Sequence, residues 1–401
     1  MSRTIAALVG IGAIGASALV CAPAQAAAHS PKPAASKLAG NGTSSSPDVT
    51  IGGRYVVFSS TSTNLVPNDF NSRADVFIRD TVLNKTRLVS KGRSGTQSNG
   101  NSTEPVVSDD GKFVVFTSTA SNLVAGDTNG KADVFRADLG TGVITRVSTS
   151  QSGVQANGDS KRPAISGDGK LVAFVSNARN LVAGDTNNLQ DVFVRTYATP
   201  SVKRVSTTPN GTQLSTASYS PSVSFDGKYV GWTSDPFGDP NVNAWCGSAS
   251  RTLAVLSRWS PNSARPVITE AVCRGNALSK VVEPRVNMTG NVGYARLTND
   301  GYAEFNSRGR SGLYDYNYNA DYYAAAYWDV GRWADAMVTT TSYSEELQIR
   351  DAANGDQTIS WAANAVSMSP DGAVIGIADR YDGQIYIWNH TTGATELVST
   401  S

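Results

Sequence analysis

The sequence is dominated by a repeat with a fixed period of 58 residues. Two sets of residues keep this spacing: Phe58, Phe116, Phe174 and Trp232, and Pro47, Pro105, Pro163 and Pro221. A fixed period of this length indicates repeated supersecondary units, none of which can bury its apolar faces alone. The chain is therefore expected to fold by stacking such units side by side.

Each unit contains four short segments typical of β-strands. In the second unit they are 106–108, 113–118, 134–137 and 143–148, rich in Val, Phe, Ile, Thr and Ser and separated by glycine-containing turns. Residues 113–116 of the second segment are apolar at consecutive positions, which predicts a sheet covered on both faces. Four-stranded antiparallel sheets stacked in this way are the blades of a β-propeller. The expected fold class is all-β, with blades starting near residues 47, 105, 163, 221, 284 and 365. This gives six blades, or seven if the long fifth interval contains two.

The repeat resembles that of the TolB-like, WD-repeat-like β-propeller family. The matching pieces are Ser-x-Asp-Gly-Lys-x-Val-x-Phe from Ser166 to Phe174, Asp-Val-Phe from Asp191 and Arg-Val-Ser from Arg204. The resemblance covers residues 46–235, is weak up to residue 364, and returns from Ser367 onward. It implies a propeller fold much more firmly than a function, since such propellers serve as scaffolds, binding modules and, less often, enzymes.

The N-terminus has the features of a secretion signal over residues 1–28. Arg3 precedes an apolar run from Ile5 to Val20, and small-residue cleavage sites follow at Ala24-Gln-Ala26 and Ala26-Ala-Ala28. A lipoprotein signal at Cys21 is the alternative, but the bulky Val20 precedes that cysteine. Residues 29–46, rich in Pro, Ser and Ala, are expected to be a flexible linker, and residues 47–401 the propeller domain. We expect a secreted, extracellular protein.

Composition and cysteine content agree with that location. The net charge is +1 with no basic run, so nucleic acid is not an expected partner, and no apolar segment is long enough to span a membrane. Removal of the signal leaves Cys246 and Cys273, which in an oxidising compartment would form a disulfide. Two unpaired buried thiols are the alternative.

The first three repeats share a long connection between their second and third strands that contains an Asp-x-Asn element. Its oxygen-bearing residues are candidate calcium ligands: Asp69, Asn71 and Asp75; Asp127, Asn129 and Asp133; and Asp185, Asn187 and Asp191. The alternative is that these side chains cap turns without any ion.

A second set of repeated loops follows the fourth strand of each unit. In an antiparallel meander the loops after the second and fourth strands emerge on one face, so this face is a candidate ligand-binding surface with Gln97, Asn99, Gln155, Asn157 and Gln213. The alternative is that these residues solvate a rim. Four residues of an aromatic-rich stretch are further candidates for ligand contact, with core filling as the alternative: Tyr314, Tyr316, Tyr318 and Trp328.

The sequence offers no catalytic residue that we would name. His29 and His390 are the two histidines, and there is no Gly-x-Ser-x-Gly motif and no phosphate-binding loop. We therefore expect a secreted binding module whose partner is an extracellular protein or a cell-surface glycan. The alternative is a carbohydrate-active enzyme, a glycan hydrolase or lyase, that uses carboxylates such as Asp69, Asp127, Asp185, Asp315 and Asp321.

Overall fold

The chain is represented by a computed structural model, which describes residues 38–208, 211–234 and 357–401 and the strands between residues 252 and 351. Of the strands between residues 252 and 358 only the backbone is described, apart from the side chain of Leu347. Within these residues the chain forms seven antiparallel sheets, each made of four consecutive strands. No α-helix occurs among them, and the two short 3-10 turns are η1 (Ile51–Gly53) and η2 (Arg93–Gly95). The predicted all-β fold is confirmed.

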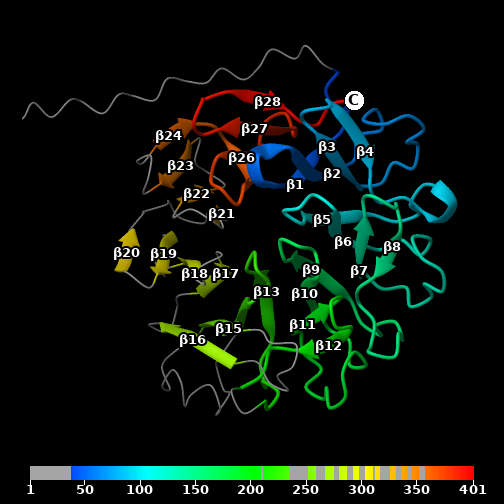
Figure 1. Ribbon diagram of the computed structural model, residues 1–401, viewed down its shortest axis with the longest axis vertical. Coiled ribbons are helices and arrows are strands. Elements are labelled where there is room, and N and C mark those ends of the chain that lie inside the picture. The colour runs from blue at the N-terminus through cyan, green and yellow to red at the C-terminus, as the bar shows by residue number, and fades with distance from the viewer. Residues whose placement is uncertain are drawn as a thin grey trace, which may run out of the picture.

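The strands of the first four sheets are β1 Ser44–Val49, β2 Tyr55–Ser60, β3 Asp75–Asp80 and β4 Lys85–Leu88; β5 Ser102–Val107, β6 Phe113–Ser118, β7 Asp133–Asp138 and β8 Ile144–Arg146; β9 Ser160–Ile165, β10 Leu171–Ser176, β11 Asp191–Thr196 and β12 Ser201–Arg204; and β13 Ser218–Val223, β14 Tyr229–Ser234, β15 Thr252–Arg258 and β16 Val267–Arg274. Those of the last three are β17 Lys280–Val286, β18 Val292–Leu297, β19 Ala303–Gly309 and β20 Gly312–Tyr316; β21 Ala326–Val330, β22 Ala336–Thr341, β23 Glu346–Asp351 and β24 Gln357–Ser360; and β25 Ala363–Met368, β26 Val374–Asp379, β27 Ile385–Asn389 and β28 Thr395–Leu397. Figure 1 shows the sheets arranged in a ring, with the first strand of each near the centre and the fourth at the rim.

Two sheets occupy the long fifth interval of the sequence, β17–β20 and β21–β24, so the described residues contain seven sheets rather than six. The outer strands of the fourth sheet are β15 and β16, which lie between Trp232 and the next repeat near residue 284. The first strands also begin earlier than expected. In the second sheet, β5 runs through Pro105 because the strand has a bulge there: its register shifts between Thr103 and Val106, and Glu104 has φ 55°. Proline lacks an N–H and is tolerated at such a bulge.

The consecutive apolar residues of the second strands pack in two directions. Phe116 on β6 lies in a cluster with Val57 and Ile78 of the first sheet, whereas its neighbour Val115 packs with Val172 and Phe174 of the third. Alternate side chains of a strand point to opposite faces, so a sheet between two others needs apolar residues at every position. The ring of sheets is held together by these shared clusters.

The ring closes without a sheet shared between the two ends of the chain. Ala39 forms an isolated antiparallel bridge with Thr400, and the Gly40 N–H donates to the Ser399 carbonyl at 2.9 Å. Residues 39–43, expected to lie in a flexible linker, thus occupy the place that a loop between repeats takes elsewhere, and β1 begins at Ser44, before the expected boundary at residue 47.

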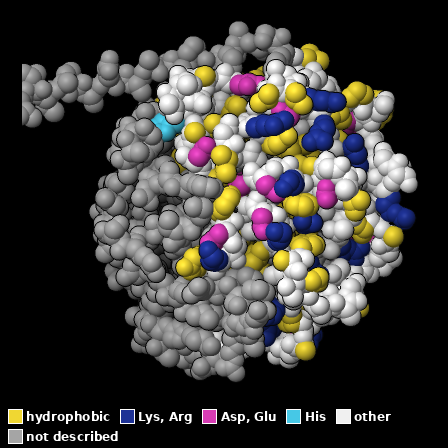
Figure 2. All heavy atoms as spheres, in the orientation of Figure 1, with side chains coloured by type: hydrophobic (Ala, Val, Ile, Leu, Met, Phe, Trp, Pro, Cys, Tyr) yellow, Lys and Arg dark blue, Asp and Glu magenta, His cyan; other side chains and the backbone are white. Residues whose placement is uncertain are grey.

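Over the part of this face whose residues are described, Lys and Arg side chains are interspersed with Asp and Glu (Figure 2). Among the residues described, no helix has the length and apolarity needed to cross a bilayer.

Candidate functional site

The connections between strands separate onto two faces of the ring. The connection after β2 contacts the loop after β4, because the Gln97 side-chain amide donates to the Asn68 carbonyl at 2.8 Å. On the other side, the turn after β3 contacts the turn after β1 through the Thr81 N–H and the Arg54 carbonyl. The predicted grouping of loops is confirmed, and we call the face formed by the loops after second and fourth strands the long-connection face.

The Asp-x-Asn element forms a buried hydrogen-bonded network in each of the three repeats. In the second repeat the Asp133 carboxylate accepts from the Ser148 hydroxyl at 2.5 Å and from the Asn129 amide at 2.8 Å. The Ser148 oxygen in turn accepts from the Val134 N–H. Asp75 and Asp191 have the same two partners in their own repeats, Ser90 with Asn71 and Ser206 with Asn187. The network fixes the start of each third strand.

An arginine neutralises the carboxylates in two of these repeats. Arg146 lies 3.3 Å from Asp127 and 3.8 Å from Asp133. Arg204 lies 3.6 Å from Asp185 and 3.8 Å from Asp191. The first repeat has Leu88 at the matching position, so Asp69 and Asp75 have no such cation.

These contacts favour the capped-turn interpretation over calcium in the second and third repeats. An arginine already supplies the positive charge there. Asp133, Asp185 and Asp191 already accept hydrogen bonds. Within the described part of the chain, no three side chains of His, Cys, Asp or Glu gather as metal ligands. A calcium site at Asp69, Asn71 and Asp75 stays a prediction. The same networks engage Asp69, Asp127 and Asp185, the carboxylates considered for the enzyme alternative. Of the other two, Asp315 lies on β20, where only the backbone is described, and Asp321 lies outside the described residues.

Stability should depend on pH through these buried carboxyls. Burial raises the pKa of Asp75 and of Asp191 to about 6, against the opposing effect of the Ser90 and Ser206 hydrogen bonds. Unfolded aspartates titrate near pH 4, so the folded state binds these protons more tightly. The contribution of these protonated carboxyls to the free energy of unfolding is complete below about pH 4 and is lost as the pH rises through about 6.

Asp75→Asn, which cannot ionise, is therefore expected to gain about 2–3 kcal/mol of unfolding free energy relative to the wild type between pH 4 and 6. Urea unfolding across this range measures the difference. Asp80→Asn is the control with the opposite sign: despite the opposing effect of burial, the N–H groups of Leu83 and Val82 and the Arg54 guanidinium lower the Asp80 pKa. A difference between Asp75→Asn and wild type that does not change with pH would contradict the raised pKa.

The candidate ligand residues of the loops after fourth strands connect neighbouring repeats. Asn99 donates to the Ser121 hydroxyl at 2.8 Å and accepts from the Ser121 N–H, so it joins the first repeat to the second. Asn157 accepts from the Arg179 N–H at 2.9 Å and joins the second repeat to the third. These asparagines have a structural use that the sequence does not distinguish from ligand binding.

The glutamines attach each loop to its own sheet. Gln97 donates to Asp69 at 3.1 Å, and Gln213 donates to Asp185 at 2.9 Å. Gln155 donates to the Thr128 hydroxyl and accepts from Arg146 at 2.6 Å. Held in this way, the long-connection face is a pre-organised surface, and Gln97, Gln155 and Gln213 are half-buried within it.

Other candidates fall partly outside the description. Tyr314 and Tyr316 lie on β20, opposite Ser307 and Phe305, and Trp328 lies on β21 opposite Thr339; their side chains, and Tyr318 altogether, lie outside the described residues. Cys273 lies on β16 opposite Leu253, and Cys246 lies outside the described residues, so the disulfide stays a prediction.

Sequence reasoning missed an exposed aromatic residue on the long-connection face. Phe70 is 77% exposed, although Asp69 beside it is buried and Asn71 is held by Asp75. The signal was present in the repeat itself, because the matching positions in the second and third repeats are Thr128 and Thr186. A departure from the repeat at an exposed position marks a residue that the fold does not require.

Comparison with solved structures supports the fold. The chain resembles a prolyl endopeptidase (TM-score 0.54, 14% identity, covering 90% of this chain and 50% of that one) and the β-propeller domain of Cps50 (Swd1) from Myceliophteria thermophila (TM-score 0.51, 10% identity, 88% and 98%). TolB from Acinetobacter baumannii is also among the matches, at 20% identity over 68% of this chain and 53% of that one, with a TM-score of 0.39. The chain therefore spans about half the length of the endopeptidase and of TolB.

No protein-family model and no curated protein sequence matches the chain. The similarities to solved structures are too distant in sequence to transfer an activity and concern the fold alone. Together with the ring of four-stranded sheets, they show that the chain is a β-propeller, in agreement with the resemblance of its repeat to TolB-like and WD-repeat-like propellers.

Proposed function

We propose that the chain is a secreted binding module that recognises an extracellular protein partner through the long-connection face. The observation that supports this most is Phe70, a 77% exposed phenylalanine in a connection whose neighbouring side chains are fixed. Aromatic anchors on rigid loops contribute strongly to protein interfaces because they bury a large area at a small entropy cost. A surface glycan, which also stacks on aromatic rings, is the second ligand class for the same residue.

The location of Phe70 strengthens the proposal. Single exposed apolar residues are common on protein surfaces and need no explanation by themselves. Phe70, however, replaces a threonine of the repeat and follows Asp69, which Gln97 holds at 3.1 Å. The loop thus presents the ring without having to become ordered on binding, which reduces the entropic cost of association.

The test is capture from culture supernatant or cell-wall extract on immobilised protein, with Phe70→Thr as the main variant. This change installs the residue of the other two repeats, so the fold should be unaffected and the melting temperature unchanged. We expect the affinity for the captured partner to fall by about tenfold or more. A glycan array with the same two proteins distinguishes a sugar ligand.

The matched control is Val82→Thr, which removes a similarly exposed apolar side chain (69%) from the opposite face. It should leave capture unchanged. If Val82→Thr abolishes capture while Phe70→Thr leaves it intact, the partner binds the other face and this proposal is wrong.

A further inference from the structure

Two neighbouring cavities at the rim are repeats of one another. One, of about 670 Å³, lies between the loop 150–154 and the outer strand β12, and the other, of about 580 Å³, lies between the loop 91–95 and the outer strand β8. Leu181, Val182 and Ala183 in the first match Leu123, Val124 and Ala125 in the second, and Val202 matches Ile144. Each pair is separated by the 58-residue period. Both cavities have the size of a small ligand site.

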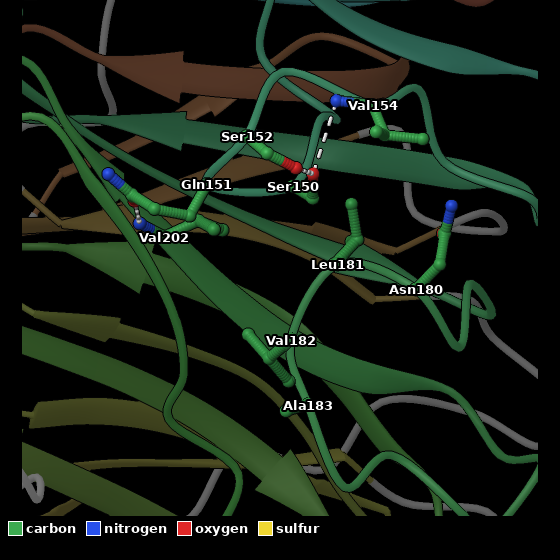
Figure 3. Close-up of a pocket in the computed structure, with 9 residues that line it drawn as sticks. All are labelled: Ser150, Gln151, Ser152, Val154, Asn180, Leu181, Val182, Ala183 and Val202. Atoms are coloured by element: carbon green, nitrogen blue, oxygen red, sulfur yellow. Dashed lines mark hydrogen bonds between the residues drawn. The ribbon is translucent and has the colours of Figure 1, made fainter.

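In the first cavity a glutamine side chain occupies the edge of the outer strand. The Gln151 carboxamide accepts from the Val202 N–H at 3.0 Å (Figure 3). It also donates to the Pro200 carbonyl at 3.0 Å. It therefore takes up one donor and one acceptor of the β12 edge, as the backbone of an added strand would. The chain itself shows which chemistry this edge binds, namely an amide.

In the second cavity the same edge is open. The Val147 N–H donates to the Val134 carbonyl of β7, and the Asp138 N–H of β7 donates to the Val143 carbonyl. Bonded and non-bonded pairs alternate along an antiparallel ladder, so the pair Ala137 and Ile144 is a non-bonded one. The Ile144 N–H therefore points away from β7, toward the rim. Among the described residues, none accepts from the Ile144 N–H or donates to the Gly142 carbonyl, the groups that match Val202 and Pro200. Gln151 is replaced here by Arg93, whose guanidinium has no acceptor for an N–H.

The open cavity also differs in charge. Lys91 and Arg93 both line it and are exposed, and within the described part of the chain neither side chain forms an ion pair. The matching residues of the other cavity are Thr149 and Gln151, which are neutral. Two unpaired cations beside an open strand edge, over the apolar residues Leu123, Val124 and Ile144, complement an extended segment with acidic and apolar side chains.

We propose that the outer edge of β8 binds an extended acidic peptide segment of a protein partner, which adds a strand to the second sheet. Its main chain bonds the Ile144 N–H and the Gly142 carbonyl, an acidic side chain pairs with Lys91 and Arg93, and an apolar side chain packs on Val124. This inference rests on the proposed function in assigning a protein partner, but it uses a surface separate from Phe70.

The test is fluorescence anisotropy with a labelled octapeptide of alternating valine and aspartate. The wild type should bind it, and should not bind the same peptide with lysine for aspartate or with N-methylated backbone amides. Arg93→Gln installs the residue that closes the neighbouring cavity and should weaken binding by about tenfold or more. Arg93→Lys, which keeps the charge, should retain binding, and Arg93→Ala, which leaves the edge open, should fall between them. Gln151→Arg should open the other edge and add a second site.

Hydrogen exchange supplies a readout that needs no peptide. The Ile144 amide should exchange faster than the Val202 amide in the wild type and become protected in Arg93→Gln. Phe70→Thr should bind the octapeptide like the wild type. Loss of partner capture through Phe70 can therefore be distinguished from loss of peptide binding at β8. The inference is overturned if the wild type does not bind the octapeptide, if Arg93→Gln binds it unchanged, or if the Ile144 amide is already as protected as that of Val202.

Discussion

Replacement of Asp133 by alanine is expected to lower the free energy of unfolding by about 3–5 kcal/mol, because it removes the acceptor at the centre of a buried polar network. Asp133 is fully buried. Its carboxylate accepts from Ser148 and Asn129, and Arg146 lies 3.8 Å away. Without it, the buried Ser148 hydroxyl loses its acceptor. The half-buried Asn129 amide keeps only the Ala156 carbonyl, and Arg146 keeps Asp127 and Gln155.

Urea unfolding at pH 7 measures this loss. Asp133→Asn is the matched variant, since it keeps the shape and one acceptor oxygen but points an amide group at the Asn129 donor, and it should cost about 1–2 kcal/mol. If Asp133→Ala is as stable as Asp133→Asn, the network does not contribute as the geometry indicates.

Arg79→Ala is expected to give the second large effect, a decrease of about 2–4 kcal/mol in the free energy of unfolding. It removes a buried, hydrogen-bonded side chain from the junction where the ring closes. Arg79 is fully buried on β3. It donates to the Thr86 hydroxyl at 3.0 Å and to the Ser401 carbonyl at 3.4 Å, and Thr86 itself donates to the Thr400 carbonyl. The side chain thus joins the first sheet to the segment that follows the last.

The repeat provides a comparison for this variant. The second sheet has Ala137 at the matching position, so a blade does not need the arginine for its own fold. In the third sheet Arg195 again reaches the preceding repeat, donating to the Val147 carbonyl at 2.7 Å, and Arg195→Ala should cost a similar amount. Arg54→Ala removes an exposed arginine that pairs with the buried Asp80, and it should cost less than about 1 kcal/mol. Thermal unfolding of the three variants decides the point: an Arg79→Ala loss no larger than that of Arg54→Ala would show that closure does not depend on Arg79.

The fold was predictable where the repeat is regular and not where it diverges. The consecutive apolar residues 113–116 predicted a sheet covered on both faces, and Val115 and Phe116 do pack on opposite neighbours. Between residues 280 and 360 the regular pattern of the repeat is largely absent, so the sequence left open whether this interval contains one sheet or the two that the structure shows. Strand pairing there depends on backbone register, which the side-chain pattern of a diverged repeat specifies weakly.

The candidate site was predictable in position but not in role. Asn99 and Asn157 attach one repeat to the next, and the glutamines Gln97, Gln155 and Gln213 hold each loop on its own sheet. A polar residue that recurs for such a structural reason looks the same in sequence as one that recurs to bind a ligand. The departures from the repeat were more informative than the repeat. Phe70 and Arg93 stand where the other copies have Thr128, Thr186 and Gln151, and both are exposed.

The sequence by itself determined the local architecture: a 58-residue unit of four strands, glycine-containing turns between them and sheets apolar on both faces. These follow from residue properties over a few positions, namely side-chain alternation, turn preference and the need to bury apolar surface. Tertiary structure alone decided which polar groups have partners. The bonds from Gln151 to Val202 and Pro200, from Asn99 to Ser121 and from Arg79 to Ser401 join segments distant in the chain. A hydrogen bond requires its donor and acceptor to lie within about 3.5 Å, and only the closed ring of sheets brings these groups that close.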